Sequence, residues 1–231
     1  MSVYDAVTER IKGLPPNTIS HGSISFPDRG PWGNSRYRGN CSGHVYKRVF
    51  EHLRPRVFTD PMVGSGGSVD VAREMGIEVY GFDLHSGFNI LKDSILETVG
   101  KPSDLVLSHP PYHDMIRYSG SEWGRGGEPH SDDLSRCGTE DQFMDKLYIA
   151  LLNQRTATVT GGHYGLIIGD VRRGGRYFSP QAEIIARMPR DELRSVLIKA
   201  QHNMASNSVR YAPLKFPKIL HEYVVLWQKP A

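Results

Sequence analysis

The stretch of residues 57–68 reads Val-Phe-Thr-Asp-Pro-Met-Val-Gly-Ser-Gly-Gly-Ser. It predicts a short apolar strand, a glycine-rich turn and a helix that begins near Ser68. Glycine allows positive φ and lets a ligand approach the backbone closely. The N–H groups at the start of the helix favour the negative end of such a ligand. A tight turn without a ligand is the alternative, and no Gly-Lys-Ser/Thr follows that would indicate a phosphate-gripping P-loop.

A pair of carboxylates strengthens the ligand-binding interpretation. The strand expected at 57–60 ends in Asp60, and a second strand expected at 78–83 ends in Asp83. In a doubly wound sheet, a carboxylate about 20 residues after the glycine turn binds the ribose of a nucleotide. The two strands therefore predict a nucleotide-like site at the carboxyl edge of a parallel sheet.

The remaining pattern predicts one α/β domain, because 231 residues suit a single core. The expected helices are 2–12, 43–54, 68–76, 140–158 and 180–189, and the expected strands are 57–60, 78–83, 88–96, 104–107, 164–169, 194–201 and 221–229. The last two strands are joined without a clear helix, which favours an antiparallel pair. Residues 17–42 and 113–139 are expected to be loops. The aromatic and arginine residues of the first loop fit either a strand of nucleic acid or a lid over a cofactor.

The composition is typical of a soluble protein, with 39% hydrophobic and 23% charged residues. No run of ~18 apolar residues or signal peptide is evident, so no membrane contact is expected. Cys41 and Cys137 make neither a disulfide framework nor a metal cluster, which predicts a cytoplasmic protein without a metal site. The net charge is +3 and the basic residues are mostly arginine, which indicates either nucleic-acid binding or a solvated surface.

Two motifs resemble those of the amino-group DNA methyltransferases. Residues 60–68 resemble their motif I, commonly Asp-Pro-Phe-x-Gly-Ser-Gly-Thr, and His-Pro-Pro-Tyr at 109–112 is similar to their motif IV, Asp/Asn/Ser-Pro-Pro-Tyr/Phe/Trp. Residues 221–227 are similar to their closing strand. The resemblance implies a Rossmann-like class I methyltransferase fold: a seven-stranded, mostly parallel sheet with an antiparallel last strand and helices on both faces. It implies a single domain over 1–231, with a lid-like segment within 1–42 and a target-recognition loop at 113–139.

The resemblance also implies S-adenosylmethionine as the cofactor. It assigns to the methionine end of the cofactor the residues Asp60, Pro61, Met62, Gly64, Ser65 and Gly66. Asp83 would take the ribose hydroxyls. Asp93 would lie near the adenine, and a helix cap is the alternative for this residue. Segment 36–43 loosely occupies the place of motif X, which covers the methionine end.

Methyl transfer to the exocyclic amine of a flipped base is the activity that the resemblance implies, carried by His109, Pro110, Pro111 and Tyr112. The amine is a poor nucleophile because its lone pair is delocalised into the ring. Acceptors against its N–H bonds return electron density, and in the family they are the first side chain of the motif and the first proline carbonyl. Proline fixes φ near −65° and holds these acceptors in place. The aromatic ring stacks on the extruded base.

His109 departs from the Asp, Asn or Ser of the family. Neutral imidazole has one acceptor nitrogen and protonated imidazole has none. Activity is therefore expected to fall as the pH drops through the pKa of His109, near ~6.5 if it is unperturbed. Ser108 is the second choice for this position. Adenine N6 is favoured over cytosine N4 as the target, although histidine fits neither group of enzymes.

Loops are expected to recognise the target sequence, because a separate recognition domain of ~100 residues does not fit in a chain of this length. The loops are 113–139 and 202–217. The candidates for phosphate and base contacts are Arg117, Trp123, Arg125, Arg136, Arg172 and Arg173, together with Arg176. Ordinary surface charge is the alternative for each of them.

The sequence thus favours a DNA methyltransferase that acts on duplex or single-stranded DNA, as a monomer or homodimer, in a restriction-modification, phage or orphan setting. A second enzyme hypothesis is methylation of RNA guanine or of a protein glutamine. A third is a module that binds S-adenosylmethionine or nucleic acid without catalysis. Intact Asp60, Asp83 and Pro-Pro-Tyr argue against the third.

Overall fold

The computed structural model describes residues 22–118, 128–202 and 216–231. Its centre is a seven-stranded sheet with the order β1-β8-β9-β5-β4-β2-β3. The strands are β1 Ser23–Ser25, β2 Val57–Asp60, β3 Glu78–Gly81, β4 Ser103–Ser108, β5 Thr158–Ile168, β8 Leu193–Ala200 and β9 His221–Gln228. In this sheet β9 runs antiparallel to both neighbours, β5 and β8, and the other described pairs are parallel. The expected antiparallel pairing of the two late strands is confirmed.

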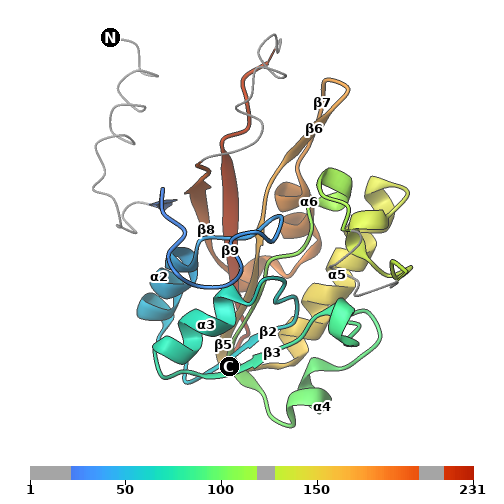
Figure 1. Cartoon of the computed structure of the whole chain (residues 1–231). Coiled ribbons are helices and arrows are strands. Elements are labelled where there is room, and N and C mark those ends of the chain that lie inside the picture. Colours follow the sequence, from blue (N-terminus) through green and yellow to red (C-terminus); the bar gives the residue numbers. More distant parts are fainter. Residues whose placement is uncertain (1–21, 119–127, 203–215) are drawn as a thin grey trace.

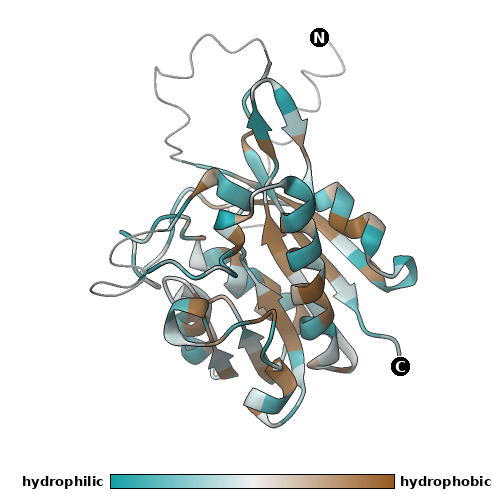
Figure 2. Cartoon of the chain, turned by 90° about the vertical axis from the view of Figure 1, so that its right-hand side faces the viewer, coloured by the Kyte–Doolittle hydropathy of each residue, from teal (hydrophilic) through white to brown (hydrophobic). Residues whose placement is uncertain are grey.

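Helices cover both faces of the sheet (Figure 1). On one face lie α2 Gly43–Leu53 and α3 Gly67–Glu74, and on the other lie α4 Ile95–Val99, α5 Glu140–Thr156 and α6 Pro180–Arg187. Alternate residues of each strand point to opposite faces. In β9, Val224 and Leu226 pack toward α2, whereas Val225 and Trp227 pack toward α5. Figure 2 shows the hydrophobic strands in the middle of these layers. The central strands are apolar on both sides because both faces are covered.

Side-chain caps mark the beginnings of α5 and α6. The Thr139 hydroxyl accepts a hydrogen bond from the Gln142 N–H at 3.1 Å and starts α5. Ser179 caps α6, whose first residue is Pro180. None of the described helices combines the length and the apolar character needed to cross a membrane.

The strand expected at 88–96 is wrong. Polar side chains close this segment into turns: the Asp93 carboxylate accepts from the Asn89 N–H at 2.7 Å, and the Asn89 side chain accepts from the Leu91 N–H at 3.1 Å. The seventh strand is instead β1, which pairs with β8 at the opposite edge of the sheet and lies in a segment expected to be a loop. The helix expected at 2–12 lies outside the described residues.

An unexpected hairpin follows β5. Its strands are β6 Val171–Arg173 and β7 Arg176–Phe178, and it projects beyond the sheet (Figure 1). Arg173 forms an ion pair with Asp114, which follows the His-Pro-Pro-Tyr motif, and Arg176 forms one with Glu140 at the start of α5. Two ion pairs therefore link the hairpin to the beginning of the 113–139 region and to the start of α5.

A glycine in β5 allows a close approach of β9. A Cβ at Gly165 would lie 2.2 Å from the Val225 carbonyl oxygen, a backbone atom that the sheet holds in place. We expect Gly165→Ala to lower the free energy of unfolding by about 1–3 kcal/mol, the usual effect of overpacking. Urea denaturation measures it. Gly138→Ala is the matched control, because its Cβ would meet only a side-chain oxygen at 3.4 Å. Equal stability of the two variants would contradict the expectation.

Candidate active site

A cavity lies at the carboxyl ends of β2, β3 and β4, as the sequence predicts for a ligand site in such a sheet. It encloses about 900 Å³ of empty space, part of which is open to solvent. Its wall comes from the segments 37–46, 61–68, 83–90, 109–111 and 132–134, together with Tyr118. The glycine turn and the His-Pro-Pro motif therefore open into the same cavity.

The glycine-rich turn forms one wall, and Asp83 braces it. Gly64 has a φ of +48°, and its N–H donates to the Asp83 carboxylate at 2.8 Å. The other oxygen of Asp83 lies 2.6 Å from the His85 ring nitrogen. A Cβ at Gly64 would lie 3.2 Å from the Tyr37 ring, so a side chain there would intrude between the turn and the lid-like segment. Pro61, Met62, Gly64 and Ser65 line the cavity with Asp83.

Asp60 lies beneath this turn and does not line the cavity. It is 1% exposed, and its carboxylate accepts hydrogen bonds from the Met62 N–H at 2.9 Å and the Ser68 hydroxyl at 2.5 Å. Burial raises the pKa of Asp60 to about 7, although these two hydrogen bonds oppose the shift. The expected direct contact of Asp60 with a cofactor is therefore replaced by a bracing role.

Two other residues expected at the cofactor lie elsewhere. The Asp93 carboxylate is directed to the Asn89 backbone and is not part of the cavity wall. Gly66, with a φ of +85°, shapes the turn before α3, and Gly67 lines the cavity in its place. The alternative of a helix cap does not hold for Asp93 either, because the residue that caps α4 is Ser94.

Sequence reasoning missed the wall opposite the turn. It consists of Phe88, Asn89, Ile90, Asp132, Asp133 and Leu134. The Asn89 side chain donates to Asp132 at 2.8 Å, which joins the turn after β3 to the segment before α5. Hydrogen bonds from Lys92 and Asn89 lower the pKa of Asp132 to about 2. The only sequence signal was the cluster of Asn and Asp that closes turns at 89–93.

The segment after β1 lies along α3. The Trp32 indole donates to Glu74 at 2.6 Å and the Gly33 N–H donates to Asp70 at 3.0 Å. The Ser65 hydroxyl donates to Asn40 at 2.8 Å. These bonds hold the segment that contributes Tyr37, Gly39, Asn40 and Cys41 to the cavity wall.

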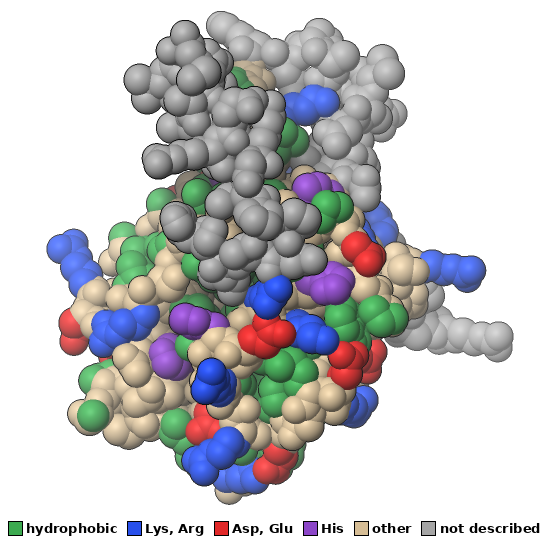
Figure 3. Space-filling model, turned by 90° about the vertical axis from the view of Figure 1, so that its left-hand side faces the viewer, with side chains coloured by type: hydrophobic (Ala, Val, Ile, Leu, Met, Phe, Trp, Pro, Cys, Tyr) green, Lys and Arg blue, Asp and Glu red, His purple; other side chains and the backbone are tan. Residues whose placement is uncertain are grey.

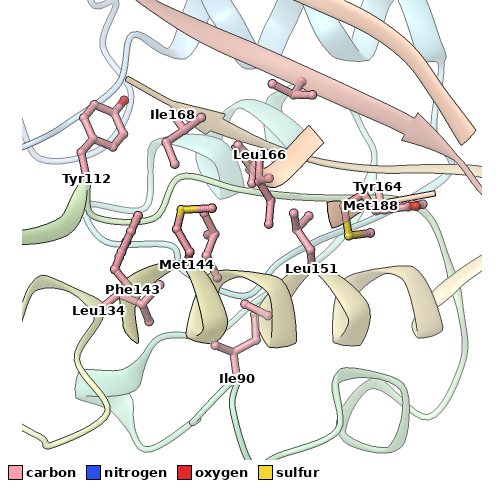
Figure 4. Close-up of a cluster of buried hydrophobic side chains, with 14 of the residues drawn as sticks. Ile90, Tyr112, Leu134, Phe143, Met144, Leu151, Tyr164, Leu166, Ile168 and Met188 are labelled. Atoms are coloured by element: carbon pink, nitrogen blue, oxygen red, sulfur yellow. The ribbon is translucent and has the colours of Figure 1, made fainter. Parts of the chain in front are cut away.

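The His-Pro-Pro-Tyr segment turns its first and last side chains toward each other. His109 Nε2 lies 2.7 Å from the Tyr112 hydroxyl, and His109 and Pro111 line the cavity. Tyr112 is only 9% exposed, and a Cβ at Gly169 would lie 2.8 Å from its ring. Figure 4 shows Tyr112 at the end of the core cluster beside Ile168. The expected stacking of Tyr112 on a base is therefore not supported, because the ring is part of the core.

No protein-family model and no curated protein matches this sequence. Solved structures do match it. TrmN from Thermus thermophilus superposes with a TM-score of 0.50 and 14% identity over 83% of this chain and 50% of its own. The chain has the Rossmann-like class I methyltransferase fold.

Other structures with this class I fold are similar at lower TM-scores. A second Thermus thermophilus protein, provisionally named a DNA modification methylase, gives a TM-score of 0.35 and 20% identity over 76% of this chain and 53% of its own. An rRNA methylase from Streptococcus thermophilus gives 0.44 and 11% over 80% of this chain and 95% of its own. The chain spans about half the length of each of the two Thermus proteins.

Around the mouth of the class I fold, most of the arginines expected to contact nucleic acid are held by carboxylates. Arg117 and Arg173 both face Asp114, and Arg136 lies 3.5 Å from Asp133 and donates to the Tyr118 carbonyl at 2.7 Å. Arg172 packs against the rings of Tyr177 and Phe216, each 5.3 Å away. Trp123 and Arg125 lie outside the described residues. Figure 3 shows basic and acidic side chains interspersed on the face it displays. Exposed ion pairs stabilise a protein by about 0–1 kcal/mol, so such arginines exchange partners readily.

The pKa of His109 is lower than the value expected for an unperturbed histidine. Desolvation disfavours the charged imidazole and lowers the pKa to about 4, although the Glu222 charge opposes the shift. The ring is therefore neutral across the pH range in which activity was expected to fall. A decline of activity through pH ~6.5 is not expected from His109.

The lowered pKa of His109 should, in contrast, be detectable in the pH dependence of the free energy of unfolding. The unfolded chain binds a proton at His109 below pH ~6.5, whereas the folded chain does so only near pH 4. The contribution of His109 to stability is therefore present above pH ~6.5 and is lost as the pH falls toward 4. We expect the free energy of unfolding to rise more steeply between pH 4.5 and 6.5 in the wild type than in His109→Asn, measured by urea denaturation. The raised pKa of Asp60 changes stability with pH in the opposite direction. Asp60 is present in both proteins, so its effect cancels in the comparison. Parallel curves would refute the shift.

Proposed function

We propose that this protein is an S-adenosylmethionine-dependent methyltransferase that acts on the exocyclic amine of a base in DNA, with adenine N6 favoured over cytosine N4. One observation carries the proposal: the glycine turn with Asp83 and the His109-Pro110-Pro111 segment open into one cavity. The first is a nucleotide-binding arrangement, and the second presents an acceptor to an amine.

The cavity wall suits the proposed cofactor. Gly64 leaves the turn without a side chain next to Tyr37, so the backbone is accessible to a ligand. Asp83 offers carboxylate oxygens for ribose hydroxyls, and each oxygen retains acceptor capacity beside its present bond. Phe88, Ile90 and Leu134 provide apolar contacts for an adenine ring. When bound, S-adenosylmethionine would supply the methyl group.

His109 would act on the amine rather than on the cofactor. Its low pKa keeps the imidazole neutral, so one ring nitrogen is available as an acceptor at neutral pH. With the Pro110 carbonyl, this nitrogen would accept the N–H bonds of the amine and return electron density to its nitrogen. Acceptors fixed in advance need little reorganisation as charge develops.

Another ring must take the place of Tyr112 against the base. The aromatic residues that line the cavity are Tyr37, Tyr46, Phe88 and Tyr118. The Tyr37 and Tyr118 rings lie 5.7 Å apart at the mouth, from two segments distant in the sequence. A base stacked on aromatic rings gains about 1–3 kcal/mol, which supports these two as the stacking residues.

The test offers the purified protein methyl-labelled S-adenosylmethionine with duplex DNA, single-stranded DNA and RNA, and identifies the methylated nucleoside by mass spectrometry. We expect N6-methyladenine in DNA. N4-methylcytosine would correct the base, and label confined to RNA would overturn the DNA assignment. Measurable cofactor binding without label on any nucleic acid would overturn the enzymatic function.

A further inference from the structure

The β6–β7 hairpin is basic and lies at the edge of the sheet where the cavity opens. Residues 171–178 contain three arginines and no acidic residue. The hairpin follows β5, which runs parallel to β4, so it leaves the sheet at the same carboxyl edge as the His-Pro-Pro-Tyr segment (Figure 1). The ion pair between Arg173 and Asp114 links it to the residues directly after that segment. A nucleic acid that reaches the cavity therefore meets the hairpin at this edge.

Arg172 differs from the other two arginines of the hairpin in its partners. Those two form ion pairs with carboxylates, whereas the printed contacts of Arg172 are with two aromatic rings and a backbone carbonyl. Its guanidinium carbon lies 5.3 Å from the ring centroids of Tyr177 and Phe216, and Nη1 donates to the Pro217 carbonyl at 2.5 Å. Within the described part of the chain, no carboxylate neutralises the charge of Arg172.

Both rings are exposed to solvent, and Tyr177 is anchored at its hydroxyl. Tyr177 is 44% exposed and Phe216 is 47% exposed. The Tyr177 hydroxyl donates to the Asp170 carboxylate at 2.5 Å, and Asp170, which is 3% exposed, also accepts from the hydroxyls of Ser179 at 2.7 Å and Tyr223 at 3.1 Å. A buried carboxylate requires such donors. The root of the hairpin is therefore fixed to the sheet, and it presents an exposed ring beside a charged guanidinium.

The chemistry of this surface fits single-stranded nucleic acid. Every base has a π-face that stacks on an aromatic side chain, and arginine binds phosphate through charge-assisted hydrogen bonds. In a duplex the bases stack on one another, so a protein ring gains a base only where the strand is unpaired. An acidic protein surface would attract the arginines equally well, but it offers no rows of flat rings for Tyr177 and Phe216. The pairing of exposed rings with an arginine therefore favours an unpaired strand.

We propose that Arg172, Tyr177 and Phe216 form a surface that binds an unpaired nucleotide of single-stranded DNA outside the cavity, with a base stacked on an exposed ring and a phosphate bound by Arg172. The surface follows from the contacts above, and only its service to methyl transfer rests on the proposed function. Held in this way, the strand would carry its target base into the cavity without the cost of extracting it from a duplex.

The chain contains a matched control pair at the opposite edge of the sheet. Lys101 Nζ lies 5.9 Å from the centre of the Tyr80 ring, and Lys101 precedes β4, at the amino ends of the strands. Unlike Arg172, Lys101 is neutralised by a carboxylate, that of Glu78 at 2.6 Å. Tyr80→Ala and Lys101→Ala therefore remove the same kinds of group as Tyr177→Ala and Arg172→Ala, away from the cavity.

The experiment is fluorescence anisotropy with a labelled oligodeoxynucleotide of mixed sequence, offered as a single strand and as a duplex. No cofactor is present, so the result does not depend on methyl transfer. We expect the wild type to bind the single strand at least ~10-fold more tightly than the duplex. Tyr177→Ala should weaken binding of the single strand about 5–150-fold, the loss of one stacked base. Arg172→Ala should also weaken it, with a slope of log K against log salt that is less steep by about 0.7, the loss of one phosphate contact.

Three comparisons make the anisotropy test specific. Tyr177→Phe keeps the ring and loses only the hydroxyl bond to Asp170, so its affinity should stay within about threefold of the wild type. Tyr80→Ala and Lys101→Ala should bind as the wild type does. Equal affinity for the single strand and the duplex, or an affinity of Tyr177→Ala within about twofold of the Tyr80→Ala value, would overturn the proposal.

Photocrosslinking of the wild type tests the surface without any variant. A single strand that contains 5-bromouracil should crosslink to peptides that contain Tyr177 or Phe216, identified by mass spectrometry. Crosslinks confined to other segments would overturn the proposal. Binding through this surface without methyl transfer to any nucleic acid would refute the proposed function and leave the surface in place.

Discussion

Replacing His109 with alanine is expected to lower the rate of methyl transfer about 10²–10³-fold, the usual effect of removing one fixed polar group at a reacting centre. Binding of S-adenosylmethionine should change little, because the contacts proposed for it come from the glycine turn, Asp83 and the wall at 88–90. Single-turnover rates with saturating cofactor measure the first quantity, and calorimetric titration measures the second.

Two further variants make the His109 test specific. His109→Asn provides a side-chain acceptor of the kind found in the related motif, so we expect it to retain more activity than His109→Ala. His52→Ala is the matched control, because His52 is exposed on α2 away from the cavity. Activity of His109→Ala within about threefold of the His52→Ala value would contradict a role in the chemical step.

Asp83→Ala is expected to weaken binding of S-adenosylmethionine about 10–100-fold. The Asp83 carboxylate accepts from the Gly64 N–H and lines the cavity, so its removal loosens the turn and also removes the proposed ribose contact. Hydrogen bonds to charged groups contribute about 1.5–3 kcal/mol, which corresponds to this range of affinity. Calorimetric titration measures the change.

The matched control for Asp83 is Asp145→Ala on α5, whose side chain is 72% exposed and pairs with Arg187 at the surface. It should bind the cofactor as the wild type does. A dissociation constant for Asp83→Ala within twofold of the control would remove Asp83 from the proposed site. Thermal unfolding of both variants separates loss of binding from loss of fold.

Most of the fold followed from local patterns in the sequence. β2 has the expected bounds, and α2, α3, α5 and β4 differ from theirs by one or two residues, because apolar periodicity and caps act locally. The prediction of a strand at 88–96 was wrong because the apolar residues there alternate with Asn and Asp, whose side chains close the backbone into turns. The hairpin at 171–178 was missed because its strands are three residues each and its ion pairs join distant parts of the chain.

The site was predictable only in part. The glycine turn, Asp83 and His109 were identified because their residue types and spacing carry the chemistry. The inward position of Tyr112 was not, since it depends on the absence of a side chain at Gly169, far along the chain. The pKa of His109 likewise depends on burial by segments that a local pattern does not reveal. Tertiary contacts therefore decided the protonation and the orientation of groups whose identity the motif had indicated.

The position of β9 has a consequence for synthesis of the chain. This strand lies between β8 and β5, so the sheet remains divided until residue 228 has left the ribosome. Before that point β5 and β8 both present unpaired edges, and such edges are prone to pair with other chains. Insertion of β9 should therefore complete the sheet and remove both aggregation-prone edges in one late step.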